Sequence, residues 1–202
     1  MGIRFITCVY INGKCKVAQY SNNSGFPADA GVKILNFLKA SIEDGSIETC
    51  KENVLASRFL KNEEILDCVQ KHCGGEIGDD FKLVDFYRQY PQFSIDTGTD
   101  ILNMLVKGSL LLKNDISRAN DGIFTEYGYV IDFDSKTFEV YKGFNKKKLG
   151  KSDRFYSKDQ DTLFNEFGSY PITLLALFNF NSLPDEKTFL DTIDLQEDAL
   201  SN

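Results

Sequence analysis

The 202-residue chain has no tryptophan, only one histidine and only four prolines. It also has no apolar run of the roughly 20 residues that a membrane-spanning helix needs. Its first residues, MGIRFITCVYING, contain one basic residue, Arg4, and no small-residue cleavage site, so they predict a first strand and not a signal peptide. An N-myristoylation signal needs Ser or Thr at position 6, where this chain has Ile6. We therefore expect a cytoplasmic protein.

The negative charge is unevenly distributed along the chain. The formal net charge is −7, and residues 184–202 alone contribute −5. A chain without a basic excess is not a typical nucleic-acid-binding protein. Apolar residues make up 42% of the sequence, which is enough for a sizeable core.

The five cysteines do not form a recognisable framework. Their odd number and irregular spacing argue against a secreted disulfide scaffold and favour reduced thiols. Cys68, His72 and Cys73, in the segment CVQKHC, resemble metal ligands, but strong zinc signals contain paired C-x2-C motifs. Buried structural thiols with a surface histidine are the favoured interpretation, and we expect neither a metal nor another cofactor.

Two hairpins are predicted near the ends of the chain. Asn12-Gly13 between two apolar runs is a strong hairpin signal, because both turn residues tolerate positive φ. A two-residue loop there would place Ile11 opposite Lys14 and Cys8 opposite Val17. Both faces of this hairpin are largely apolar, so we expect both to be covered. Residues 124–134 and 137–144 predict the second hairpin.

The pattern between and after the hairpins is mostly helical. Helices are predicted at about 28–42, 47–60, 62–72, 80–90, 97–107 and 186–197, a short strand at 153–157, and a third long, central strand at 170–180. This order predicts an α+β fold with a mainly antiparallel sheet from the N- and C-terminal hairpins, packed with a central run of helices. One version is a layered arrangement like that of N-terminal-nucleophile hydrolases. We predict a single domain over residues 1–183, followed by an acidic, partly helical segment at 184–202.

One helix start occurs twice. PADAGVKILNFL (27–38) and SIDTGTDILNML (94–105) share the frame D-x-G-x-x-I-L-N-x-L. Convergent helix capping explains the likeness, and an internal duplication is the alternative. Helix N-termini can bind anions, and Gly31 and Gly98 would let a ligand approach. However, Asp29 and Asp96 are good capping residues. A capping carboxylate would occupy the same N–H groups, so we expect capping and not anion binding.

Two loops are candidates for binding. The segment SNNSGFP (21–27) offers hydrogen-bonding groups and an exposed aromatic ring, and loops on rigid scaffolds often carry function. The basic stretch KGFNKKKLGKSDR (142–154) could hold phosphate or an acidic protein patch. The candidate residues are Asn22, Asn23, Ser24, Gly25, Phe26, Lys146, Lys147 and Lys148. The alternatives are a turn cluster for the first segment and a solvated loop for the second.

The catalytic candidates are weak. Cys8 with His72 could form a nucleophile–base pair, although a mid-strand cysteine is typically a packing residue. An N-terminal nucleophile would require cleavage of the chain before Thr7 or Cys8.

Several short motifs together resemble an uncharacterised family of small bacterial, phage and fungal proteins. They are MGIR (1–4), KVAQY (16–20), GFP (25–27), DTGTDIL (96–102) and TFEVYKGF (137–144). Members of that family open M-G-T-R and continue V-A-Q-Y-G-Q-W-D-G-Y-P. Ile3 departs from this pattern, and SNNSGF replaces the segment that holds the family's Trp and Asp. The resemblance implies a cytoplasmic protein of phage or mobile-element origin and transfers no catalytic residue.

We therefore predict a non-enzymatic protein that binds another protein, such as a host defence protein, in the host cytoplasm if the chain is phage-encoded. The alternatives are a hydrolase of the N-terminal-nucleophile or cysteine type, and a binder of a small ligand or nucleotide. We expect no membrane partner, and the acidic charge disfavours nucleic acid.

Overall fold

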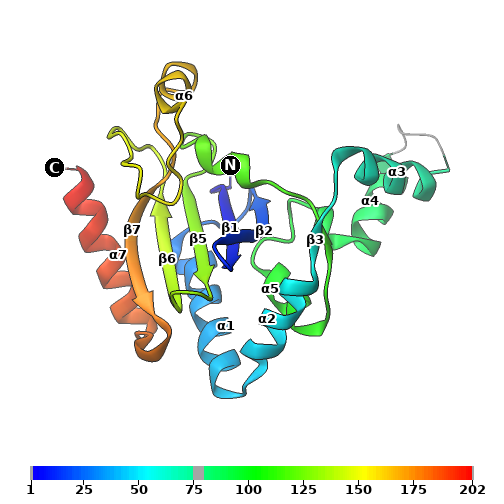
Figure 1. Ribbon diagram of the computed structural model, residues 1–202, viewed down its shortest axis with the longest axis horizontal. Helices are drawn as coiled ribbons and strands as arrows, with labels where there is room; N and C mark the ends of the chain where they lie inside the picture. Colours follow the sequence, from blue (N-terminus) through cyan, green and yellow to red (C-terminus); the bar gives the residue numbers. More distant parts are fainter. Residues whose placement is uncertain (1, 75–79, 202) are drawn as a thin grey trace.

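The computed structural model describes residues 2–74 and 80–201, and its centre is a five-stranded sheet (Figure 1). The strands are β1 (Phe5–Ile11), β2 (Lys14–Ser21), β5 (Tyr127–Asp132), β6 (Thr137–Lys142) and β7 (Thr173–Asn179), in the spatial order β2-β1-β5-β6-β7. Neighbours pair antiparallel except β1 and β5, which run parallel and join the two hairpins into one sheet. The predicted α+β fold with a mainly antiparallel sheet is confirmed.

Helices cover one face of the sheet, which we call the helix-covered face. The helices that contribute to it are α1 (Val32–Glu43), α2 (Ser46–Ala56), α5 (Asp100–Lys107) and α7 (Glu186–Ser201). Each has an apolar stripe at helical spacing, such as Ile101, Leu102 and Leu105 of α5, which are fully buried. Phe189 and Ile193 of the acidic α7 are also buried against the sheet. This face holds the main core.

The opposite face is covered by loops and is called the loop-covered face. Ile6, Cys8 and Val130 of the strands pack there against Leu149 and Phe155, which follow β6. The helical turn η3 (Ile116–Asn120) belongs to these covering segments, whereas the short helix α6 (Gln160–Phe167) projects beyond the end of the sheet, at the top of Figure 1. Burial on both faces explains why β1 is apolar at nearly every position, as predicted for a doubly covered hairpin.

A smaller cluster lies beyond the sheet, around α3 (Asn62–His72) and α4 (Asp80–Gln89). Phe86 of α4 is fully buried and stacks on Phe93 of the turn η2 (Pro91–Phe93), with ring centroids 5.9 Å apart. Strands β3 (Arg58–Phe59) and β4 (Leu111–Leu112) form a two-stranded ladder at its base. Figure 1 shows this part at the end of the molecule farthest from α7.

The register predicted for the first hairpin is right at the turn and wrong beyond it. Ile11 pairs with Lys14 as expected, but Cys8 pairs with Ala18 and not with Val17. A β-bulge between Val9 and Tyr10 is the cause, since it leaves one extra residue on β2 and exchanges the faces of the residues that follow. Ala18 therefore lies on the loop-covered face, and Val17 lies in the main core.

Other boundaries also differ from the sequence predictions. β7 is an edge strand and not a central one, and its Leu174 and Leu177 are about half exposed. Residues 153–157 form turns that cover the sheet and not a strand, and α6 was not predicted. The helix predicted at 47–60 ends at Ala56, because the Ser57 hydroxyl donates to the Asn53 carbonyl and the chain then enters β3.

No helix among residues 2–74 and 80–201 combines the length and the apolar character required to cross a membrane.

Candidate functional site

The loop at 21–27 leaves the end of β2 with its backbone fixed and its polar tip exposed. The Gly25 amide donates to the Ile3 carbonyl at 3.1 Å, and the Tyr129 hydroxyl donates to the Gly25 carbonyl at 2.8 Å. Gly25 is required here, because a Cβ would lie 2.8 Å from the Ile3 oxygen. Asn23 and Ser24 are exposed, and the Phe26 ring is 49% exposed. The segment is thus a rigidly held, solvent-facing loop.

Four side chains connect this loop to the start of the basic stretch. Phe26 packs against Tyr127, with ring centroids 6.4 Å apart. The Tyr127 hydroxyl lies 2.6 Å from both the Lys142 ammonium and the Glu197 carboxylate, and Lys142 also bonds Glu197 at 3.1 Å. Burial and the Glu197 carboxylate raise the pKa of Tyr127, which stays protonated at neutral pH. We call Phe26, Tyr127, Lys142 and Glu197 the bridging cluster.

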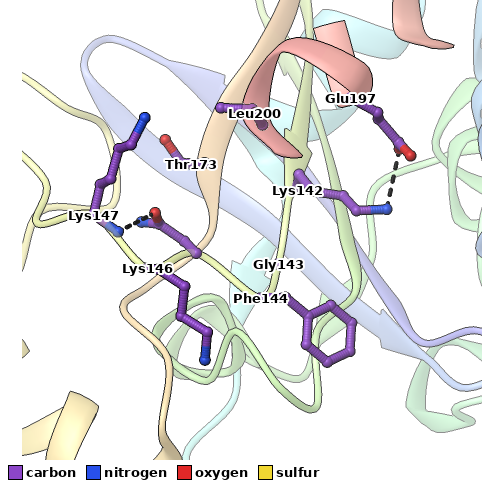
Figure 2. A pocket seen from close by; sticks show the side chains of 9 residues that line it. Lys142, Gly143, Phe144, Lys146, Lys147, Thr173, Glu197 and Leu200 are labelled. Atoms are coloured by element: carbon purple, nitrogen blue, oxygen red, sulfur yellow. Dashed lines mark hydrogen bonds and ion pairs between the residues drawn. The ribbon is translucent and has the colours of Figure 1, made fainter. Parts of the chain in front are cut away.

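A pocket of about 190 Å³ opens beside the bridging cluster (Figure 2). Its walls come from the end of β6, the loop that follows it, the start of β7 and the last turns of α7. The lining residues are Lys142, Gly143, Phe144, Asn145, Lys146, Lys147, Thr173, Glu197 and Leu200. Figure 2 shows Lys142 pointing toward Glu197, while Lys146 and Lys147 extend in other directions.

The three candidate lysines have different environments. The Lys146 ammonium donates to the Gly168 carbonyl at 2.6 Å, and Lys148 pairs with Asp161 at 2.6 Å, which raises the pKa of Lys148. Within the described part of the chain, the Lys147 ammonium makes no hydrogen bond or ion pair. Only Lys146 and Lys147 of the three line the pocket. Lys147 therefore offers an unpaired positive charge to a binding partner.

Exposed apolar side chains surround the same end of the sheet. Phe124, Phe144 and Leu200 are between 43% and 48% exposed. The Phe144 amide donates to the Gly122 carbonyl, and the Arg4 guanidinium lies 4.5 Å from the centre of the Phe124 ring. Strand directions explain why these residues meet at one end of the sheet. Strands β1, β5 and β7 begin at this end, and strands β2 and β6 finish there (Figure 1). We call Phe26, Phe124, Phe144, Lys147 and Leu200 the end surface.

The repeated helix starts meet at a second, smaller pocket. It has a volume of about 130 Å³ and lies between Asn23 and Ser24 of the loop, Lys33 of the first helix and residues 96–100 of the second. The predicted capping is wrong: neither helix has a side-chain cap, and Asp96 instead accepts a hydrogen bond from the Asn23 amide at 3.2 Å. The Asp96 carboxylate is thus held by the 21–27 loop and not by its own helix start.

The glycines of the two helix starts are explained by packing. A Cβ on Gly31 would lie 3.0 Å from the Phe189 ring, and a Cβ on Gly98 would lie 3.1 Å from the Phe5 ring. Gly98 also has a φ of +51°, a backbone conformation that favours glycine. Both glycines therefore allow close approach of core rings, and Gly98 also lines the 130 Å³ pocket.

The catalytic candidates lie apart from one another. Cys8 and Thr7 are fully buried, and Thr7 Oγ1 has no hydrogen-bond partner among residues 2–74 and 80–201. His72 belongs to the α3–α4 cluster, where it bonds Asp85 at 3.1 Å and packs edge-on against Phe86. Cys8 and His72 belong to different clusters, so the structure does not bring this candidate nucleophile and base together. No group of three or more possible metal ligands occurs in the described part of the chain, and Cys68 and Cys73 lie in the α3–α4 cluster.

A polar cluster on the loop-covered face was missed by sequence reasoning. The Arg154 guanidinium bonds Asp132 at 2.6 Å and both oxygens of Glu139 at 2.6 and 2.9 Å. It also lies 4.3 Å from the centre of the Tyr10 ring, and Glu139 accepts the Tyr141 hydroxyl at 2.6 Å. The only available signal was the position of Asp132 and Glu139 at inward-facing sites of two apolar strands. This cluster joins the loop at 150–156 to the sheet.

Comparison with known proteins adds no relative: no family model, curated protein or solved structure matches the chain.

Proposed function

We propose that this chain is a non-enzymatic binding protein that contacts a partner protein through the end surface. The observation that carries the proposal is the bridging cluster. It joins the 21–27 loop to the basic stretch, so that two candidates far apart in the sequence form one face. Three half-exposed phenylalanines on one surface match the enrichment of aromatic side chains at protein interfaces, where a few well-packed residues supply most of the binding energy.

The charges of the end surface also indicate what kind of partner protein would be complementary to it. The chain as a whole is acidic, whereas the end surface contains Lys147 and adjoins Lys142 and Lys146. A partner with an apolar patch flanked by carboxylates would be complementary. The resemblance to the phage-associated family adds the proposal that the partner is a host protein, such as a defence component. The genes that neighbour the coding sequence test that origin.

Site-specific photo-crosslinking tests the surface. A photoreactive phenylalanine analogue replaces Phe26 in one variant and Phe144 in another, and the control replaces Leu66 of α3, which is 53% exposed. We expect the first two variants to capture the same protein in host lysate and the control to capture none of it. Capture of that protein from position 66 alone, or of different proteins from positions 26 and 144, would contradict the proposal.

Titration with the purified partner makes the test quantitative. Loss of about 2 kcal/mol per hot-spot residue corresponds to roughly thirtyfold weaker binding for F26A or F144A. L66A, which removes a similarly exposed apolar side chain in the α3–α4 cluster, should bind like the wild type. Equal affinities of all three variants would exclude the end surface as the binding site.

A second candidate function is binding of a small anion, such as a nucleotide, in the 190 Å³ pocket. The lysines that line this pocket favour it. A nucleotide at 100 times its Kd should stabilise the protein by about 2.7 kcal/mol. A thermal-shift panel that shows no shift for the wild type, or the same shift for K147A, would exclude this candidate.

A further inference from the structure

Two of the five cysteines, which are all free, share the loop-covered face of the first hairpin. In the observed register Cys15 lies opposite Tyr10, and Cys8 lies opposite Ala18. Cys8 and Tyr10 lie two residues apart on one face of β1, so Cys15, which is opposite Tyr10, lies on the same face at a position diagonal to Cys8. The register predicted from the sequence, with Cys8 opposite Val17, also places the two cysteines on one face at diagonal positions.

The two thiols differ in exposure. Cys8 is fully buried, whereas Cys15 is partly exposed. Cys15 pairs with Tyr10, and the Arg154 guanidinium lies 4.3 Å from the centre of the Tyr10 ring. Arg154, which is itself paired with Asp132 and Glu139, lowers the pKa of Cys15 less than the hydrogen bonds of Cys15 do. Solvent and oxidants can therefore reach Cys15 but not the buried Cys8.

The two thiols also differ in pKa. A hydrogen bond with Cys15 and burial both raise the pKa of Cys8. Hydrogen bonds from Cys8 and Tyr10 lower the pKa of Cys15, although burial opposes this. Cys15 is thus the more acidic of the two thiols. Burial raises the pKa of Cys50, in the main core, to about 12.

We propose that Cys15 and Cys8 form a redox-active pair, in which Cys15 reacts with hydrogen peroxide and Cys8 resolves the product as an intrachain disulfide. The Cys15 thiolate attacks one peroxide oxygen, the O–O bond breaks, and hydroxide leaves, which gives a sulfenic acid. The Cys8 sulfur then attacks the Cys15 sulfur, the S–O bond breaks, and the departing hydroxide takes the Cys8 proton to form water. The two thiols lose two electrons, which reduce the peroxide to water.

The hairpin has to adjust slightly for the bond to form. Diagonal neighbours in a regular ladder have Cα atoms about 7–8 Å apart, and disulfides span at most about 6.8 Å. The bulge next to Cys15 is the irregular part of the ladder, where such a movement disrupts the fewest hydrogen bonds. A bond formed under this strain is more readily reduced than a relaxed one, which suits a reversible modification.

Peptide mapping of the native wild-type protein tests the proposal directly. Trypsin cleaves after Arg4, Lys14 and Lys16, so the two cysteines fall in different peptides, 5–14 and 15–16. After mild peroxide treatment we expect these peptides to appear linked, and dithiothreitol should separate them. Preferential oxidation of Cys50, Cys68 or Cys73, or a Cys15 that oxidises to sulfinic acid with no linked peptide, would overturn the proposal.

Variants and alkylation rates separate the two roles. In C8A, Cys15 should still react with peroxide, but its sulfenic acid should persist and be trapped by dimedone. In C15A, Cys8 should stay reduced. In the untreated wild type, iodoacetamide should modify Cys15 at least about tenfold faster than Cys50, because Cys15 is partly exposed and its pKa is lowered, whereas Cys50 is buried and its pKa is raised. Equal rates would refute the assignment, and this measurement needs no variant to fold.

Discussion

The two faces of the sheet are packed differently. Stacked aromatic rings fill the helix-covered face, whereas the loop-covered face contains the Arg154 guanidinium and its two carboxylate partners. On the first, Phe138 stacks on Phe189 with ring centroids 5.8 Å apart, and both rings are fully buried. On the second, Arg154 joins Asp132 and Glu139, whose side chains are 11% and 6% exposed. The stabilisation that packed rings provide does not change with pH, whereas the stabilisation from the ion cluster depends on the charges of its carboxylates. The two faces should therefore respond differently to substitution and to acid.

Removal of a stacked ring should have the largest effect. F138A deletes a fully buried ring between strands and α7, and a Phe-to-Ala change in a core costs about 3–5 kcal/mol. Urea unfolding followed by circular dichroism should show a lower midpoint with an unchanged slope. The loss should be the same at pH 7 and pH 4. If the loss of unfolding free energy in F138A depended strongly on pH, titratable groups would also contribute to the stability of the helix-covered face.

Removal of the guanidinium should have the next largest effect. R154M leaves two nearly buried carboxylates without their cation, and breaking such a pair costs up to about 3–5 kcal/mol. Because Arg154 is itself 19% exposed, we expect about 2–3 kcal/mol at pH 7. R154K should lose less, because it keeps the charge but not the forked geometry. Equal unfolding midpoints of R154M and the wild type in urea would show that the ion cluster does not stabilise this face.

The same variant should respond to pH in a predictable direction. Burial alone would raise the pKa of Asp132, but Arg154 and the Ser135 and Asp134 amides lower it. Its stabilising contribution is thus present above the unfolded pKa of about 3.9 and is lost as the pH falls through the lower folded pKa. The difference in unfolding free energy between the wild type and R154M should narrow from pH 7 to pH 3. A constant difference would contradict this linkage.

The smallest effect is expected where the loop-covered face ends. Leu177 on β7 is 53% exposed beyond the covering loops, so L177T should change the unfolding free energy by no more than about 0.5 kcal/mol. The next residue, Phe178, packs between Phe138 and Phe189 on the other face, and F178A should cost several times more. Similar losses for both variants in thermal unfolding would mean that the two faces of β7 are equally covered.

The fold was predictable where local signals were sufficient. Asn12-Gly13 predicted its turn, and the apolar stripe of Ile101, Leu102 and Leu105 predicted the buried face of α5. The register beyond the turn failed, because a bulge is decided by packing on both faces and not by the turn residues. Asp29 and Asp96 failed as caps, and for Asp96 the reason is similar, since a tertiary partner, Asn23, holds its carboxylate.

The candidate site was partly predictable. Composition alone selected the loop at 21–27 and Lys146 to Lys148, and which of these act in binding is still a prediction. Their junction through Tyr127 and Glu197 joins residues that are far apart in the sequence, and no local pattern indicates such a contact. The Arg154 cluster was missed because its three charges come from two strands and a loop.

By itself, the sequence determined the helices, the two hairpins and the apolar faces, because turn geometry and side-chain periodicity act over a few residues. Only the tertiary structure decided that β1 pairs with β5, that β7 lies at the edge, and that Cys8 pairs with Ala18 and not with Val17. These outcomes depend on strand order and on a bulge, which are set by the burial of both faces of the sheet at once.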